Sequence, residues 1–305
     1  MTVNLTVKVA GIEMKNPLVT ASGTYGFGQE YRDLYPPEVL GAVVTKTIRL
    51  RPHPGNPPPR VAEAPAGLIN AIGIPSKGWD HYVREEVPRL RQLEVPIIQS
   101  IVGETLDEYV ELTERLTELG FLAGIELNLS CPNLRAGGLS LGLDPDMVYE
   151  LVRRVRAATD LPLLAKLTPN TADVVGLARS VQAGGADGIA MINTVRAMAI
   201  DLRTRRPVLG NISGGLSGPA IKPIALYQIW EVYEAVDIPI IGMGGATDYR
   251  DVLEFILAGA RAVALGTVNF VDPSAAPRIL RDLGRYLEEN GIDDINDLVG
   301  AAHRT

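Results

Sequence analysis

The stretch Ile238–Thr267, "IPIIGMGGATDYRDVLEFILAGARAVALGT", holds two apolar runs with a helical pattern between them. Asp248 and Asp251 are residue types that begin a helix, and Gly259 is a type that follows a helix's last turn. The apolar runs lack the polar alternation of a half-exposed strand, so both of their faces are expected to be buried. The stretch therefore predicts two parallel strands joined by a helix, with a glycine-containing turn after each strand.

The same unit recurs along the chain. Six more apolar runs precede this stretch, at residues 17–22, 41–47, 95–101, 124–130, 161–168 and 187–194. Between them, Thr105 with Glu108 fits a capping box, Asp144 precedes a proline suited to a first helical turn, and Asn170 is expected to cap another helix. Repeated strand–helix units of this number predict an α/β fold, a (β/α)8 TIM barrel. A doubly wound open sheet is the alternative, and the number of units and the placing of the glycines favour the barrel.

Two segments stand outside this repeat. Residues 4–14, "NLTVKVAGIEM", alternate with period two, which predicts a short N-terminal β-hairpin before the barrel. Residues 201–218, "DLRTRRPVLGNISGGLSG", predict a second hairpin inserted before helix 6. No low-complexity linker divides the chain, so we expect a single domain over residues 1–305.

Composition narrows the classes of function. The one cysteine, Cys131, cannot form an intrachain disulfide and cannot supply the four thiolates that an iron–sulfur cluster usually needs. The net charge of −7 and the lack of a Lys/Arg block argue against nucleic-acid binding. We find no long apolar run, no signal peptide and no metal-ligand pattern, so we expect a cytoplasmic protein without a membrane span or a bound metal.

Polar residues gather where the predicted strands end, which is where (β/α)8 barrels place their active sites. The residues at these ends are Ser22, Lys46, Thr47, Gln99, Ser100, Asn128, Cys131, Lys166, Asn193, Thr194, Gly244, Gly245, Gly266 and Thr267. So many polar groups and glycines at equivalent positions predict a pocket for a polar ligand.

The glycines and lysines of this set each allow two interpretations. Gly244, Gly245 and Gly266 follow the last two strands, where barrels bind phosphate, although glycine also serves simply to make tight turns. Lys46 and Lys166 follow apolar strands. A buried lysine needs an anion or a chemical role, whereas a lysine that extends out of the barrel mouth needs neither.

Cys131 is open to two interpretations as well. Free cysteines are often buried and inert. Cys131, however, follows a strand end and precedes a glycine-rich segment, and a thiol with an ordinary pKa of about 8.5 is a usable general base when its surroundings tune it. The residues alone leave both interpretations standing.

Nine motifs, in order along nearly the whole chain, resemble those of the dihydroorotate dehydrogenases, which are flavin enzymes of pyrimidine biosynthesis. They are "ASGTYGFG", "TKT", "GLINAIGIPSKG", "NLSCPN", "AKLTPN", "INT", "GGLSGPAIKP", "GMGG" and "LGTVNF". The resemblance implies an FMN-binding (β/α)8 barrel, with one FMN per chain, that oxidises dihydroorotate to orotate. A cysteine in the "SCPN" loop is similar to the class 1 enzymes, whereas class 2 enzymes have a serine there and an N-terminal extension.

Within class 1, "CPNLRAGGLSLGLDP" resembles subclass 1B most, although "LGLDP" stands where we expect something closer to "FGTDP". Subclass 1B implies electron transfer to NAD through a partner subunit that carries FAD and a [2Fe–2S] cluster. It also implies a homodimer of catalytic chains within a heterotetramer. The alternatives are a class 1A homodimer linked to fumarate, a dihydropyrimidine dehydrogenase-like barrel, a tRNA dihydrouridine synthase, and a phosphate-ligand-binding barrel without turnover.

The resemblance also implies sites, residue by residue. FMN is expected to contact Ser22, Lys46, Thr47, Gln99 (where an Asn is common), Asn128, Lys166, Ile192, Gly218, Gly244, Gly245, Gly266 and Thr267. The substrate is expected to contact Lys46, Asn70, Ala71, Ile72, Gly73, Ile74, Asn128, Asn193 and Thr194. Cys131 is the implied catalytic base at C5 while hydride leaves C6 for the flavin. Lys166 is implied to stabilise the reduced flavin, and the "NLRAGG" stretch is the expected lid.

Overall fold

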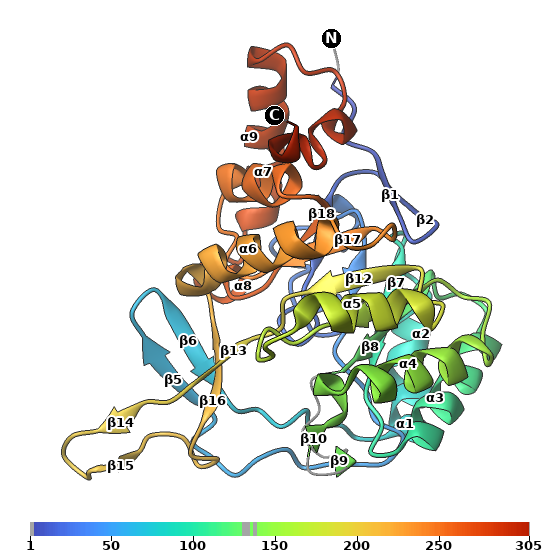
Figure 1. Cartoon of the computed structure of the whole chain (residues 1–305), viewed down its shortest axis with the longest axis vertical. Helices are drawn as coiled ribbons and strands as arrows, with labels where there is room; N and C mark the ends of the chain where they lie inside the picture. The colour runs from blue at the N-terminus through green and yellow to red at the C-terminus, as the bar shows by residue number, and fades with distance from the viewer. Residues whose placement is uncertain (1–2, 130–134, 137–138, 305) are drawn as a thin grey trace.

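The computed structural model describes residues 3–129, 135–136 and 139–304, and an eight-stranded parallel sheet forms its centre (Figure 1). In order around the sheet, the strands are β3 (Leu18–Thr20), β18 (Ala260–Leu265), β17 (Ile240–Met243), β12 (Gly188–Met191), β11 (Leu163–Lys166), β8 (Gly124–Asn128), β7 (Ile97–Ile101) and β4 (Val43–Val44). A parallel bridge between Val19 and Ala42 joins the two outer strands, so the sheet closes on itself. The predicted barrel is therefore confirmed, and the open sheet is excluded.

Helices lie between successive strands on the outside of the barrel (Figure 1). The long ones are α3 (Leu106–Glu118), α4 (Pro145–Arg156), α5 (Val174–Ala183), α6 (Lys222–Tyr233), α7 (Tyr249–Leu257) and α9 (Ala275–Glu289). The short ones are α1 (Trp79–His81), α2 (Val87–Leu90) and α8 (Val268–Val271), with a π-helical turn, η2, at Tyr82–Glu86. The connection from β3 to β4 contains only a single 3-10 turn, η1 (Pro37–Val39), which ends where the backbone becomes extended at Leu40.

The structure confirms some of the predicted helix starts and contradicts one of them. Asp248 and Asp251 form a complete capping box at α7. Thr105 accepts from the N–H of Glu108 at the start of α3, but the Glu108 carboxylate accepts from Glu104 N rather than from Thr105 N. The prediction for Asn170 was wrong: α5 begins four residues later and is capped by Asp173. The Asn170 side chain instead donates to Thr194 O and accepts from Arg196 N, so it ties two strand-end loops together.

Both predicted hairpins are present. The N-terminal strands β1 (Val7–Val9) and β2 (Ile12–Met14) pair antiparallel. A Cβ built on Gly124 would lie 3.0 Å from Ile12, and one built on Gly188 would lie 3.3 Å from Ala10. Because these glycines are the first residues of two barrel strands, the N-terminal hairpin covers that end of the barrel. Ligands must therefore enter at the opposite, carboxyl end.

The second hairpin, β14 (Ile200–Asp201) with β15 (Arg206–Pro207), belongs to an arm that projects from the barrel (Figure 1). The base of the arm is a four-stranded sheet of β13 (Val195–Ala197), β16 (Gly214–Ser217), β6 (Gly67–Asn70) and β5 (Val61–Ala64). It has a small core of its own, formed by Ala62, Ile69, Ala71 and Leu209. Near the other side of the mouth, β9 (Arg135–Ala136) pairs with β10 (Leu139–Ser140).

Strand register decides which side chains face into the barrel. Lys166 pairs with Asn128, and Glu126 pairs with Ser100 on one side and with Leu164 on the other. Because paired residues of parallel strands point to the same face, these five share one face of the sheet. Lys166 reaches Ser22, which follows the strand on the opposite side of the barrel, so the shared face is the interior.

Over residues 3–129, 135–136 and 139–304, we find no helix that combines the length and the apolar character needed to cross a membrane.

Candidate active site

Lys166 lies at the carboxyl end of β11, near the centre of the barrel mouth. Its side chain crosses the barrel, and Nζ lies 3.5 Å from Ser22 Oγ. The residue is only 5% exposed, and among the described residues it forms no ion pair. A lysine buried in this way is costly without an anion nearby. Lys166 therefore lies inside the mouth and does not extend into solvent. A chemical role for this lysine requires such a position.

Two asparagines line the mouth beside Lys166. Asn193 Nδ2 lies 3.4 Å from Asn128 Oδ1, so the strand ends of β8 and β12 meet there. The backbone of Asn128 is held from outside the barrel, because Tyr109 on α3 donates to Asn128 O at 2.7 Å. Asn193 Oδ1 in turn accepts from Thr194 N at 2.8 Å. These amides, which both donate and accept, are positioned side by side at the mouth.

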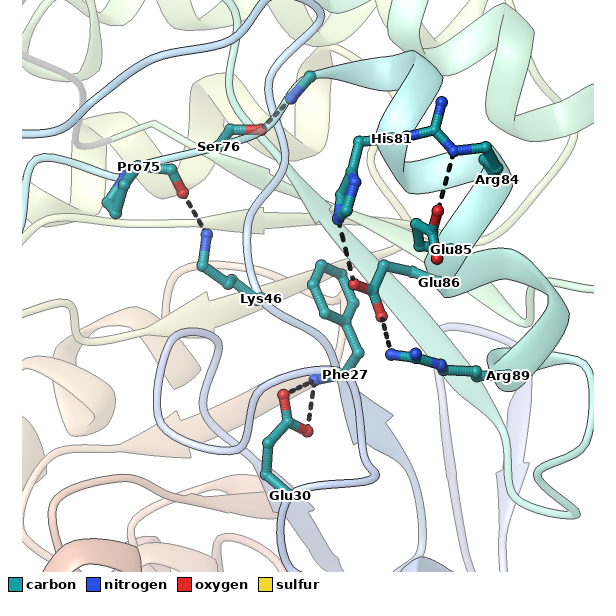
Figure 2. A network of polar contacts seen from close by, with 11 residues as sticks. Phe27, Glu30, Lys46, Pro75, Ser76, His81, Arg84, Glu85, Glu86 and Arg89 are labelled. Atoms are coloured by element: carbon teal, nitrogen blue, oxygen red, sulfur yellow. Dashed lines mark hydrogen bonds and ion pairs between the residues drawn. The ribbon is translucent and has the colours of Figure 1, made fainter.

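Lys46 lies two residues after the end of β4, and Figure 2 shows its side chain pointing toward Pro75. Its ammonium group donates to the carbonyl oxygen of Pro75, directly after the predicted substrate loop. Burial lowers the pKa of Lys46, the Glu86 carboxylate opposes that shift, and the charge on Arg49 adds to it. Lys46 is therefore a partly desolvated cation whose charge depends on its neighbours.

The π-helical turn η2 supplies the acid near Lys46. Glu86 ends this turn, and its two carboxylate oxygens lie 3.7 Å from His81 Nε2 and 3.8 Å from Arg89 Nη1 (Figure 2). The Glu86 side chain is 14% exposed. Single π turns within helices frequently mark functional sites. Here the turn brings a largely buried carboxylate into the electrostatic surroundings of Lys46.

The loop of residues 70–74 connects the projecting arm to the barrel mouth. Asn70, the last residue of β6, donates from its side chain to Gly215 O at 3.2 Å. Backbone atoms of the loop are fixed from outside: Asn56 N donates to Ile72 O at 3.1 Å, and Arg49 Nε donates to Ile74 O at 3.1 Å. Gly73 and Ile74 both have positive φ, 77° and 50°, which sharpens the bend. The loop is thus held next to Lys46, and Ala71, its second residue, is buried.

Gln99, the expected cofactor contact, and its neighbour Ser100 point to opposite faces of β7. The Gln99 amide is fully buried and is occupied by Lys46 O, Ser100 O and Thr45 Oγ1, at 3.0, 2.7 and 2.7 Å. By register, Gln99 points away from the face that holds Asn128 and Lys166, and Ser100 shares that face. Ser100 Oγ lies 2.9 Å from Thr47 Oγ1, so these two hydroxyls form the polar wall beside the lysines.

Glycines form a cradle on the other side of the mouth. Gly218, Gly244 and Gly245 have φ of 99°, 126° and 99°. A Cβ at Gly245 would lie 2.8 Å from Gly218 O, so the chain itself requires glycine there. Gly266 differs: a Cβ would meet only Ala21, at 3.6 Å. The packing of the chain therefore does not itself require glycine at this position.

The polar side chains around this cradle already bond to one another, so the backbone N–H groups of the cradle are the donors that an anion can use. Lys222 lies against Gly245, but Asp251 and Glu254 already pair with its ammonium group, each at 2.6 Å. Thr267 Oγ1 donates to Ser217 Oγ at 2.8 Å, next to Gly218. Ile192 is buried against Gly244.

Cys131, expected to be the base, lies outside the described residues, as does most of the expected lid. Three residues of the described part that lie at or below this site, Arg49, Glu86 and Glu126, were not singled out from the sequence, and Ser100 was expected at a strand end but was given no contact with the cofactor. Strand alternation applied from Asn128 back along β8 would have identified Glu126. Nothing in the sequence indicated Arg49 and Glu86, because their roles depend on the packing of η2 and of the 70–74 loop.

The family model described as dihydroorotate dehydrogenase matches residues 4–287. The chain belongs to the dihydroorotate dehydrogenase family. A protein from Desulforudis audaxviator is 53% identical over 305 residues, which is 100% of this chain and 99% of its own. One from Geotalea uraniireducens is 50% identical over 298 residues, 98% of each chain. Both relatives are named dihydroorotate dehydrogenase B (NAD(+)), catalytic subunit.

A solved structure shares the fold of this family member. It is a dihydroorotate dehydrogenase from Eimeria tenella in complex with ferulenol, with a TM-score of 0.81 and 23% identity over 99% of this chain and 89% of that one. The family implies a flavin cofactor. The cradle of Gly244, Gly245 and Gly266 beside the buried Lys166 fits a ligand that has a phosphate at one end and an electron-poor ring at the other.

Proposed function

We propose that this chain oxidises dihydroorotate to orotate in pyrimidine biosynthesis, as the catalytic subunit of an NAD-linked enzyme. The observation that carries the proposal is the match over the whole chain to relatives named as that subunit. We propose that residues 1–305 act as one flavin-binding domain. Its predicted location, the cytoplasm, stays a prediction.

We propose FMN as the flavin, because the cradle suits a single terminal phosphate and the chain has no dinucleotide fingerprint. The backbone of Gly218, Gly244, Gly245 and Gly266, with Thr267, would hold the phosphate. Ser22, Lys46, Thr47, Asn128, Lys166 and Ile192 would surround the rest of the cofactor, with Ser100 in the place that we first gave to Gln99. When bound, the flavin supplies the acceptor for two electrons.

The substrate site proposed is the space between the asparagine pair and the 70–74 loop. Dihydroorotate offers a carboxylate, which suits the cation Lys46, and ring amides, which suit Asn70, Asn128 and Asn193. Thr194 lies directly after Asn193, and residues Ala71, Ile72, Gly73 and Ile74 would close the near side. Because Lys46 is partly desolvated, its attraction for a carboxylate is stronger than that of an exposed lysine.

Proton transfer is proposed to belong to Cys131. As a thiolate it would accept the C5 proton of dihydroorotate, and the loop after it would exclude water while it does so. Lys166 is proposed to place a positive charge at the mouth, which would favour the negative charge that reduction places on the bound ring. Tyr109 contributes by fixing the backbone of Asn128 from behind.

Electrons must then leave through another protein. We propose a partner subunit that carries FAD and a [2Fe–2S] cluster, in a heterotetramer built on a homodimer of this chain. The single cysteine supports this, because the chain cannot ligate such a cluster itself. The relatives' names include the words "catalytic subunit", which also supports a partner.

The test is electron transfer in two stages. Purified chain loaded with FMN should lose its yellow colour when dihydroorotate is added without oxygen, and orotate should form. NAD reduction should require the iron–sulfur flavoprotein encoded in the same organism. Rapid reoxidation by fumarate alone would instead indicate the homodimeric enzyme, and faster reduction by a pyrimidine without a carboxylate would contradict the substrate.

A further inference from the structure

The interior of the barrel holds one acid and one base. Among the eight barrel strands, the charged residues are Glu126, Lys166 and Arg261. Arg261 is exposed on the outside, whereas Glu126 and Lys166 are 1% and 5% exposed and lie on the inner face. None of the roles assigned above uses Glu126.

Glu126 has no conventional partner within the described part of the chain. Its Oε1 is buried without a hydrogen bond, and the carboxyl group forms no ion pair there. An ionised carboxylate in such a place is very costly unless an opposite charge balances it. The neighbours along the ladder do not supply that charge, because Ser100 Oγ is engaged with Thr47 and Leu164 is apolar.

Lys166 is placed to balance Glu126. Lys166 pairs with Asn128, and Glu126 stands two residues earlier on the same strand as Asn128. With strands about 4.8 Å apart and a rise of about 3.3 Å per residue, the two Cα atoms are about 8 Å from each other. Both side chains extend from these positions into the same enclosed interior, where opposite charges attract even without direct contact.

We propose that Glu126 is the counter-charge of Lys166. It is a positioning residue on the barrel floor that sets how positive the mouth is, and so sets how readily a flavin bound there is reduced. The part that concerns the flavin rests on the function proposed above, whereas the pairing of the two side chains does not.

The effect on a flavin has a definite direction. Reduction adds negative charge near Lys166, which Lys166 favours and Glu126 opposes. In Glu126→Gln, the ratio of reduced to oxidised FMN at a fixed potential should rise at least tenfold, which is about 30 mV for two electrons. Glu126→Asp, which keeps the charge, should stay within about threefold of the wild type by the same scale. A Glu126→Gln protein with an unchanged potential would overturn the proposal.

The pairing itself is tested without flavin, by urea unfolding of the flavin-free full chain. Glu126→Gln and Lys166→Met each leave one charge buried alone, and the double variant leaves none. The double variant should therefore be more stable than the sum of the single effects predicts, by at least threefold in the unfolding equilibrium constant. The matched control is the cycle of Glu126→Gln with Arg261→Gln, which should be additive because Arg261 faces outward.

Additive behaviour of the Glu126 and Lys166 variants would overturn the pairing. If Glu126→Gln alone does not fold, folding of the double variant supports the pairing, and failure of both overturns it. A chain that takes up no FMN would contradict the proposed function but would leave the unfolding cycle intact, so the two failures are distinguishable.

Discussion

Two glycine-to-alanine substitutions should separate the part of the cradle that the fold needs from the part that a ligand needs. At Gly245, φ is 99°, and a new Cβ would lie 2.8 Å from Gly218 O and 3.0 Å from Lys222. A non-glycine residue held in such a conformation costs about 1–3 kcal/mol, before the contact with the carbonyl oxygen is included. Gly245→Ala should therefore lower the free energy of unfolding by about 2 kcal/mol or more, with or without flavin.

Gly266→Ala should behave in the opposite way. Its Cβ would meet only Ala21, at 3.6 Å. Where the backbone conformation suits alanine, the change stabilises a protein by about 0.4–1 kcal/mol through the unfolded chain. The flavin-free chain should thus keep or gain stability, while FMN binds more weakly because the methyl group occupies the approach of the phosphate.

The assay is urea unfolding of both variants without flavin, followed by titration with FMN monitored by flavin fluorescence. The difference in unfolding free energy between the two variants should be about 2–4 kcal/mol, summing the two effects above. The reasoning is refuted if Gly245→Ala is as stable as the wild type, or if Gly266→Ala binds FMN with undiminished affinity.

The remaining predictions concern charge, the base and the support of the mouth. Glu86→Gln removes the carboxylate that opposes the lowering of the Lys46 pKa, so the pKa of Lys46 should fall further. Lys46 then loses its charge at a lower pH, and the affinity for orotate should decline at a lower pH than in the wild type. Identical curves of affinity against pH would contradict this. Exposed Glu94→Gln is the matched control and should leave the curve in place. Cys131→Ala should keep the yellow flavin but lose most dihydroorotate oxidation at neutral pH. Cys131→Ser should oxidise dihydroorotate slowly at neutral pH and faster as the pH rises. Unchanged turnover of the alanine variant, or a flat pH profile of the serine variant, would count against Cys131 as the base. Tyr109→Phe removes one hydrogen bond to Asn128 O. The variant should lose about 1 kcal/mol of unfolding free energy and have a lower kcat, as measured by urea unfolding and steady-state assays. A variant with unchanged stability and full kcat would show that this hydrogen bond is dispensable.

The barrel was predictable because its signals are local. Eight short apolar runs, most of them without polar alternation, are separated by caps such as Asp144 and Asp248, and these signals specify strand and helix independently of the rest of the chain. The prediction for Asn170 failed because an asparagine satisfies a helix start and a loop junction equally well, and only the packing of residues 194–196 decides between them.

The position of a residue at the barrel mouth was predictable where a strand end determines it and not where packing determines it. Lys166 and Asn128 follow from strand position alone. Choosing between Gln99 and Ser100 required the register of β7 against β8, which a run of apolar residues does not reveal. Glu86 influences the pKa of Lys46 from the end of a π-helical turn, and the sequence "YVREE" does not predict such a turn.

Dihydroorotate is expected to deliver electrons to a flavin held at this barrel mouth. The most direct measurement is the absorbance spectrum of the FMN-loaded chain, free of oxygen and of any partner, after dihydroorotate is added. The flavin should be bleached as an equivalent amount of orotate forms. A flavin that remains oxidised in the presence of excess dihydroorotate would contradict it.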